Sequence, residues 1–148
     1  MQLSEHFSLA EFTRSETATK HGLDNKPTAA HLANLKKTAA GFEKIRAILG
    51  NEPIKITSGY RNPAVNAKVG GTPTSAHPQG FAGDFTHPKL SPLECARRIR
   101  DSDLMFDQLI LETGRGVVHI GFGPKSRRQV GEQKGGPGTK IVFKLPGD

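Results

Sequence analysis

Residues 75–84 read Ser-Ala-His-Pro-Gln-Gly-Phe-Ala-Gly-Asp, which places His77 and Asp84 on either side of a glycine turn. The small residues that follow Gly80 let the backbone approach its neighbours closely. We therefore expect the chain to turn at Gly80 and enter a tightly packed strand. That path would bring Asp84 opposite His77.

A third residue of the same chemical kind lies further along the chain. His119 stands in the run Val-Val-His-Ile-Gly-Phe, residues 117–122, which is typical of a strand that could lie beside the strand of Asp84. Two imidazoles and one carboxylate are ligands that Zn²⁺ accepts, and in a catalytic site they leave a fourth position for water. His77, Asp84 and His119 are thus the predicted zinc ligands. A turn histidine and a strand-end aspartate without a metal remain the alternative.

The same stretch carries a resemblance to a known family. Its residues fill every fixed position of the signature S-x-H-x-x-G-x-A-x-D, which is found in zinc D-alanyl-D-alanine carboxypeptidases and the related L-alanyl-D-glutamate endolysins: Ser75, His77, Gly80, Ala82 and Asp84. Residues 56–63 resemble the S-G-Y-R segment of that family, and Val118-His119 resembles its downstream metal histidine. Residues 3–12 are similar to the opening of the short bacterial and phage members. The resemblance covers residues 3–130.

The resemblance implies roles for residues around the metal. Arg61 corresponds to the arginine that binds a carboxylate of the cell-wall peptide, for which a planar guanidinium is well suited. Ser75 corresponds to a serine that hydrogen-bonds substrate, although a turn-capping role is equally compatible with its position. In many relatives an acid precedes the last metal histidine by three residues, but that position here is Gly116.

The general base must therefore come from another position. Glu112 ends the strand before the predicted turn, so antiparallel pairing would return it beside His119. Asp107 competes for the role from five residues earlier. Side chains an odd number of residues apart on a strand point to opposite faces, so only one of the two should face the zinc. We predict that Glu112 is the base.

Local signals predict an α+β domain with a small, mostly antiparallel sheet that carries the zinc site and has helices packed on it. We interpret residues 1–148 as a single zinc peptidase domain. Capping boxes at Ser8–Glu11 and Ser91–Glu94 each predict the start of a helix. Further signals predict a long helix over 27–50, a short one over 62–70, strands at 54–57, 109–111, 117–120 and 141–143, and a mobile loop at 131–138.

Composition restricts the function further. The chain has 148 residues, a net charge of +7, a single cysteine and no tryptophan. A basic surface attracts polyanions, but no recognition helix or aromatic stacking motif indicates nucleic acid as a partner. No segment has the length of a transmembrane helix and no secretion signal is present. We expect a monomer made in the cytoplasm, which reaches the cell wall after release or as part of a virion.

The motifs together predict a zinc-dependent peptidase of peptidoglycan stem peptides, of carboxypeptidase or endolysin type. Two alternatives belong to other classes. The missing acid at Gly116 and the resemblance to the hedgehog zinc fold leave open a non-catalytic, zinc-stabilised domain that binds cell wall. The basic charge leaves open a nucleic-acid binder.

Overall fold

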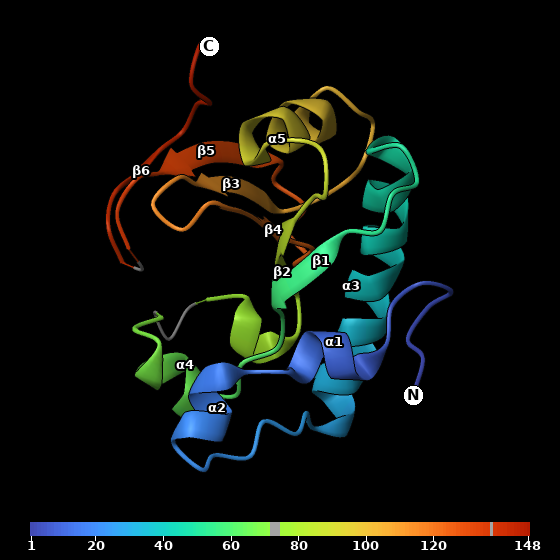
Figure 1. Cartoon of the computed structure of the whole chain (residues 1–148), viewed down its shortest axis with the longest axis vertical. Coiled ribbons are helices and arrows are strands. Elements are labelled where there is room, and N and C mark those ends of the chain that lie inside the picture. The colour runs from blue at the N-terminus through green and yellow to red at the C-terminus, as the bar shows by residue number, and fades with distance from the viewer. Residues whose placement is uncertain (72–74, 137) are drawn as a thin grey trace.

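The structure, a computed structural model, describes residues 1–71, 75–136 and 138–148. It is an α+β fold, as the sequence predicted, with one sheet of strand order β1-β2-β4-β3-β5-β6. The long helix α3 runs beside the β1–β2 part of the sheet, and α5 lies over the β3–β5 part (Figure 1). The small helices α1, α2 and α4 gather at the opposite end of the molecule from α5. In the described part of the chain, no helix is both long and apolar enough to cross a membrane.

The elements follow the chain in an order of helices, strands and one hairpin. The helices are α1 Leu9–Thr13, α2 Glu16–Lys20, α3 Ala29–Ile48, α4 Pro63–Lys68 and α5 Pro92–Arg100, with a short 3₁₀ turn, η1, at His77–Gln79. The strands are β1 Lys55–Ser58, β2 Ala82–Thr86, β3 Gln108–Glu112, β4 Val117–Gly121, β5 Gln129–Gln133 and β6 Ile141–Val142.

Helix starts follow the local signals. Ser8 and Glu11 form the reciprocal capping box that was predicted for α1. Ser91 caps α5 by accepting a hydrogen bond from the Glu94 backbone, with proline at the first turn. The second half of that box does not form, because the Glu94 side chain instead accepts from Arg98 one turn later, at 3.0 Å.

The sheet contains one parallel pair that local patterns did not predict. β3 and β4 form the expected hairpin, and β4 pairs with β2 on its other side. β4 ends level with the start of β3, so the chain crosses that end of β3 through residues 122–128 and returns along its far side as β5, parallel to β3. The predicted loop over 131–138 is therefore wrong at its beginning, because residues 131–133 belong to β5. Pro137 lies outside the described residues.

The two faces of the sheet have different environments. Leu109, Val118, Ile120 and Phe85 point to one face and are fully buried beneath α3 and α5. Phe42 of α3 lies at the centre of this core, with ring centroids 5.6–6.1 Å from four other phenylalanines: Phe7, Phe12, Phe85 and Phe122. The opposite face of the sheet carries the polar residues of the site.

Candidate metal centre

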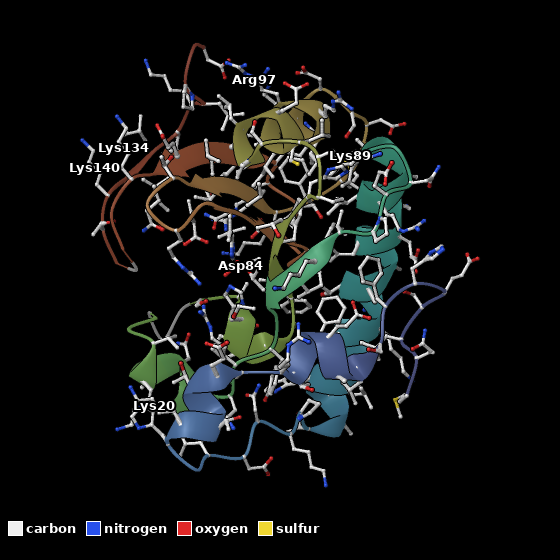
Figure 2. All side chains as sticks on the ribbon, viewed as in Figure 1. Lys20, Asp84, Lys89, Arg97, Lys134 and Lys140 are labelled. Atoms are coloured by element: carbon white, nitrogen blue, oxygen red, sulfur yellow. The ribbon has the colours of Figure 1, made fainter. Side chains whose placement is uncertain are left out.

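Strand register brings two of the predicted ligands together. Asp84 of β2 is paired directly with His119 of β4 in the antiparallel ladder, so their side chains project from the same face. Asp84 Oδ1 lies 2.9 Å from His119 Nδ1. Asp84 is completely buried near the centre of the molecule (Figure 2). A carboxylate in this position needs a charged or donor partner.

The third ligand arrives from the 3₁₀ turn η1. His77 Nε2 lies 3.2 Å from Asp84 Oδ1 and 3.2 Å from His119 Nδ1. Its other ring nitrogen, Nδ1, lies 2.6 Å from the Gly59 carbonyl, which can only accept, so Nδ1 carries the hydrogen. In the neutral ring, Nε2 therefore carries a lone pair that is directed at the other two ligands.

This donor set fits zinc. A tetrahedral ion with bonds of about 2.0–2.1 Å separates its ligand atoms by roughly 3.3 Å. The three separations between His77, Asp84 and His119 are 2.9, 3.2 and 3.2 Å. Lone pairs of two neutral imidazoles and a carboxylate repel one another at this distance unless a cation or a proton lies between them. The geometry accordingly supports the predicted zinc site.

The Ser-Gly-Tyr-Arg segment acts as a support for His77. The Gly59 carbonyl that orients the His77 ring is held in place because the next amide, that of Tyr60, donates to Phe12. Asn25 then spans the segment, donating to the Tyr60 carbonyl at 2.8 Å and accepting from the backbone of Asn62 at 3.0 Å. A hydrogen bond to the second nitrogen of a metal histidine fixes its tautomer and orientation. Asn25 was not predicted, since it lies 52 residues before His77 in the chain.

Helix α3 holds the other end of the metal loop. Thr38 donates to the Gly80 carbonyl at 2.7 Å, and Asn34 donates to the Gln79 carbonyl at 2.8 Å. Gly80 has a φ of +83°, which favours glycine, and a Cβ there would come within 2.8 Å of the His31 carbonyl. At Gly83 a Cβ would lie 2.8 Å from the Phe42 ring. The expected turn and tightly packed strand are confirmed.

Burial and charge shift the pKa values of the ligands in different directions. Burial lowers the pKa of His77, although Asp84 opposes this change. Burial also acts to lower the pKa of His119, but the hydrogen bond and charge of Asp84 outweigh it and the pKa is raised. Burial alone would raise the pKa of Asp84; the two histidines instead hold it well below its ordinary value. Asp84 is thus the anionic ligand of the set.

A cavity of about 610 Å³ opens over His77 and His119, and Glu112 also lines it. Glu112 projects from the same face as His119, because its partner in the hairpin is Val117, two residues before His119. Its side chain is 8% exposed. Burial, reinforced by the charge of Asp84, raises its pKa.

Arg115 is a site residue that sequence reasoning missed. It stands in the turn between β3 and β4, and its Nη1 lies 3.2 Å from Glu112 Oε1 and 3.4 Å from Asp84 Oδ2. The guanidinium therefore holds the oxygen of Asp84 that faces away from the histidines, and one oxygen of Glu112. The only available signal was an arginine between two glycines, which indicated a turn and nothing more.

Asp107 differs from Glu112 in its partners rather than in its face. Asp107 precedes β3, which begins at Gln108, so strand alternation does not set its side chain against that of Glu112. Both carboxylates line the cavity, contrary to the expected opposite faces. Asp107 accepts from Arg127 Nε at 2.7 Å and Nη2 at 2.8 Å. These hydrogen bonds lower its pKa. Asp107 is thus occupied by a two-point ion pair.

The two predicted substrate residues also line the cavity. Arg61 is 7% exposed, and no described residue accepts a hydrogen bond from its side chain, whose Nε is buried. Burial lowers its pKa, against the charge of Asp84. Ser75 Oγ accepts from the His77 backbone at 3.2 Å, which is the turn-capping arrangement.

Comparison with known proteins agrees with this site. The fold and the site place the chain among α+β proteins that carry a His-Asp-His metal centre on one face of a sheet. The sequence model of the peptidase M15 family matches residues 5–121. The chain belongs to the peptidase M15 family of zinc metallopeptidases. It is similar to the zinc D-Ala-D-Ala carboxypeptidase of Streptomyces albus G, with 32% identity over 80 residues. That similarity spans 54% of this chain and 31% of the carboxypeptidase.

Proposed function

We propose that this protein is a zinc-dependent peptidase that hydrolyses the stem peptides of bacterial peptidoglycan. The observation that carries the proposal is the convergence of a His-Asp-His zinc site with a buried carboxylate, Glu112, on the wall of one cavity. Family membership supports peptide hydrolysis. The similarity to a D-Ala-D-Ala carboxypeptidase supports a wall peptide as the substrate.

His77, Asp84 and His119 would hold the zinc. When bound, zinc supplies Lewis-acid polarisation of a peptide carbonyl and makes water easier to deprotonate. Glu112 takes the proton from the attacking water and returns it to the leaving amine. Glu112 Oε1 accepts from Arg115, and no described residue donates to Oε2, so Oε2 is the atom that carries this proton.

Arg61 binds a carboxylate of the substrate in this proposal. Its guanidinium is desolvated and lacks an acid partner in the described part of the chain, so an incoming carboxylate would gain a charge-assisted, two-point interaction. Ser75, whose Oγ already accepts from the His77 backbone, still has its hydroxyl hydrogen to donate to substrate.

The test combines zinc analysis with cleavage of purified wall. Wild type should bind one zinc per chain and release new amino groups from peptidoglycan, and alanine at His77, Asp84 or His119 should remove both properties. His87 is a matched control, because among the described residues its ring nitrogens hydrogen-bond only to the backbone of Leu49, Lys89 and Leu90. Full zinc occupancy in every ligand variant would refute the site. Zinc binding without any cleavage would favour the non-catalytic wall-binding alternative.

We further propose that the enzyme acts as a monomer on the wall, after release from the cell or as part of a virion. The exposed cationic side chains Lys134 and Lys140, which project near β6, would favour approach to an anionic polymer (Figure 2). Size-exclusion chromatography and localisation of the protein during lysis test the two statements.

A further inference from the structure

The loop that joins β4 to β5 has an unusual backbone on both sides of Arg127. Ser126 has a φ of +45° and Arg128 a φ of +51°, a region that side chains other than glycine rarely adopt. Such conformations persist only where the surrounding structure holds them, and they are concentrated at functional sites. The conformation of this loop therefore needs an explanation.

Arg128 anchors the loop from the side of the core. Its Nε donates to the Leu104 carbonyl at 3.0 Å and its Nη2 to the Ser102 carbonyl at 2.9 Å. Its guanidinium also lies 4.5 Å from the centroid of the Phe106 ring. With Arg128 fixed in this way, the preceding residue is directed to the cavity side.

Arg127 is fixed by Asp107. Beside the two side-chain hydrogen bonds, the backbone amide of Arg127 donates to Asp107 Oδ1 at 3.1 Å. The pair uses Nε and Nη2, so the guanidinium plane is set while the N–H groups of Nη1 have no described acceptor. Both residues line the same cavity as His119. Lys125 also lines this part of the cavity and adds positive charge.

This cationic end of the cavity lies at a defined distance from the metal centre. His119 is level with Ile110 on β3, and Asp107 is three residues before Ile110. At about 3.3 Å per residue, that is roughly 10 Å along the strand. An extended peptide covers the same distance in about three residues. Arg61, by contrast, lies beside the metal loop, where its backbone amide donates to the His77 carbonyl.

We propose that Arg127 is a substrate-binding residue for a second carboxylate, carried by the peptide two to three residues from the scissile bond, and that Asp107 is its positioning residue. The inference rests on the proposed function, because it assumes a peptide with several carboxylates in the cavity. It assigns Asp107 to orientation of Arg127 rather than to proton transfer. The strained loop is then the cost of presenting Arg127 to the substrate.

The experiment uses synthetic stem peptides in which each carboxylate in turn is replaced by its amide. Arg127→Gln should raise KM for the free-acid peptide about tenfold or more while kcat stays within about threefold. Wild type should prefer a free carboxylate to its amide at the position two to three residues from the cleaved bond. The variant should lose this preference. Asp107→Asn should show the same pattern more weakly, with unchanged kcat.

Arg98→Gln is the matched control. Arg98 pairs through Nε with Glu94, and its side chain is 45% exposed against 42% for Arg127, but it lies on α5 and does not line the cavity. It should leave KM unchanged for all peptides. If Arg127→Gln raises KM equally for every peptide, or for none of them, the inference is overturned. The double variant Asp107→Asn/Arg127→Gln serves if the single change fails to fold.

A binding measurement separates failure of this inference from failure of the proposed function. Calorimetry on zinc-loaded wild type and Arg127→Gln compares the free-acid peptide with each singly amidated peptide. If wild type cleaves no wall peptide, the proposed function fails. The subsite is still supported if wild type binds one amidated peptide more weakly than the free-acid peptide and Arg127→Gln does not show this difference. Equal affinities for all peptides would overturn it.

Discussion

Glu112→Gln is the most informative substitution, because it tests a proton-transfer role without altering the zinc ligands. The change keeps the size of the side chain, and the amide oxygen can still accept from Arg115, which now lies 3.2 Å from Oε1. Zinc occupancy should therefore be normal. What is lost is the ability to take a proton at Oε2.

The expected loss in kcat is about 10²–10⁴-fold, the usual scale for a positioned general base, or about 3–5 kcal/mol in the activation barrier. Burial and the charge of Asp84 raise the pKa of Glu112 above that of an ordinary glutamate, which strengthens it as a base. Hydrogen bonds from Arg127 lower the pKa of Asp107 and so weaken it. Asp107→Asn should consequently retain kcat within about threefold.

The assay is single-turnover cleavage of a defined stem peptide at matched zinc occupancy, measured by metal analysis of the same samples. Single-turnover conditions separate chemistry from product release. Near-wild-type turnover in Glu112→Gln would refute the assignment. Collapse of turnover in Asp107→Asn alone would transfer the role to Asp107.

Three further predictions concern zinc, substrate and the core. Asp84 raises the pKa of His119 above its ordinary value of 6.5 in the metal-free protein, so a proton competes with zinc for this ring. As the pH falls below the raised pKa, the zinc dissociation constant should increase about tenfold per pH unit. A dissociation constant that does not change between pH 8 and pH 5 would contradict this prediction. Arg61→Lys should lower kcat/KM about tenfold or more, since an ammonium lacks the bidentate geometry; equal cleavage of free-acid and amidated peptides by wild type would count against this role. Arg61→Met should leave the unfolding free energy unchanged or higher, because the guanidinium is desolvated and its buried Nε has no hydrogen-bond partner among the described residues. Phe42→Ala should cost about 3–5 kcal/mol in denaturant unfolding, while Phe143→Ala, at a residue that is 61% exposed, should cost about 0.5 kcal/mol or less.

The stability of the metal-free protein should also depend on His119 with a defined sign. The pKa of His119 is raised in the folded state, so its protonation adds to the free energy of unfolding. This contribution is complete at pH values below the unfolded-state pKa of about 6.5, and it is lost as the pH rises through the folded-state pKa. Zinc loading should reverse the trend over the same interval, because zinc requires the neutral ring. Denaturant titrations of both forms between pH 6 and 8 measure the difference, and His119→Gln should abolish it.

The sequence was sufficient for the candidate metal ligands, which the fold brings together, and for most elements. The capping box at Ser8, the Gly80 turn and the β3–β4 hairpin are determined by interactions between residues close in the chain. The alternation of strand side chains then placed Glu112 on the face of His119 once the turn was known. The candidate zinc site was predictable because residues 75–84 match the signature of a known family, whereas residue types and spacing alone left a metal-free turn open.

Only the tertiary structure decided how the cavity is completed. β5 pairs with β3 across a sheet edge that no local pattern marks, so the loop that carries Arg127 to Asp107 could not be foreseen. The contact of Arg115 with Asp84 joins residues 31 positions apart, and Asn25 supports the Tyr60 carbonyl from 35 positions away. A sequence shows which groups can bind a proton, a metal or a carboxylate. The free energy of burying them depends on long-range packing, and this packing left Asp107 paired, Glu112 with a raised pKa and Arg61 without an acid partner among the described residues.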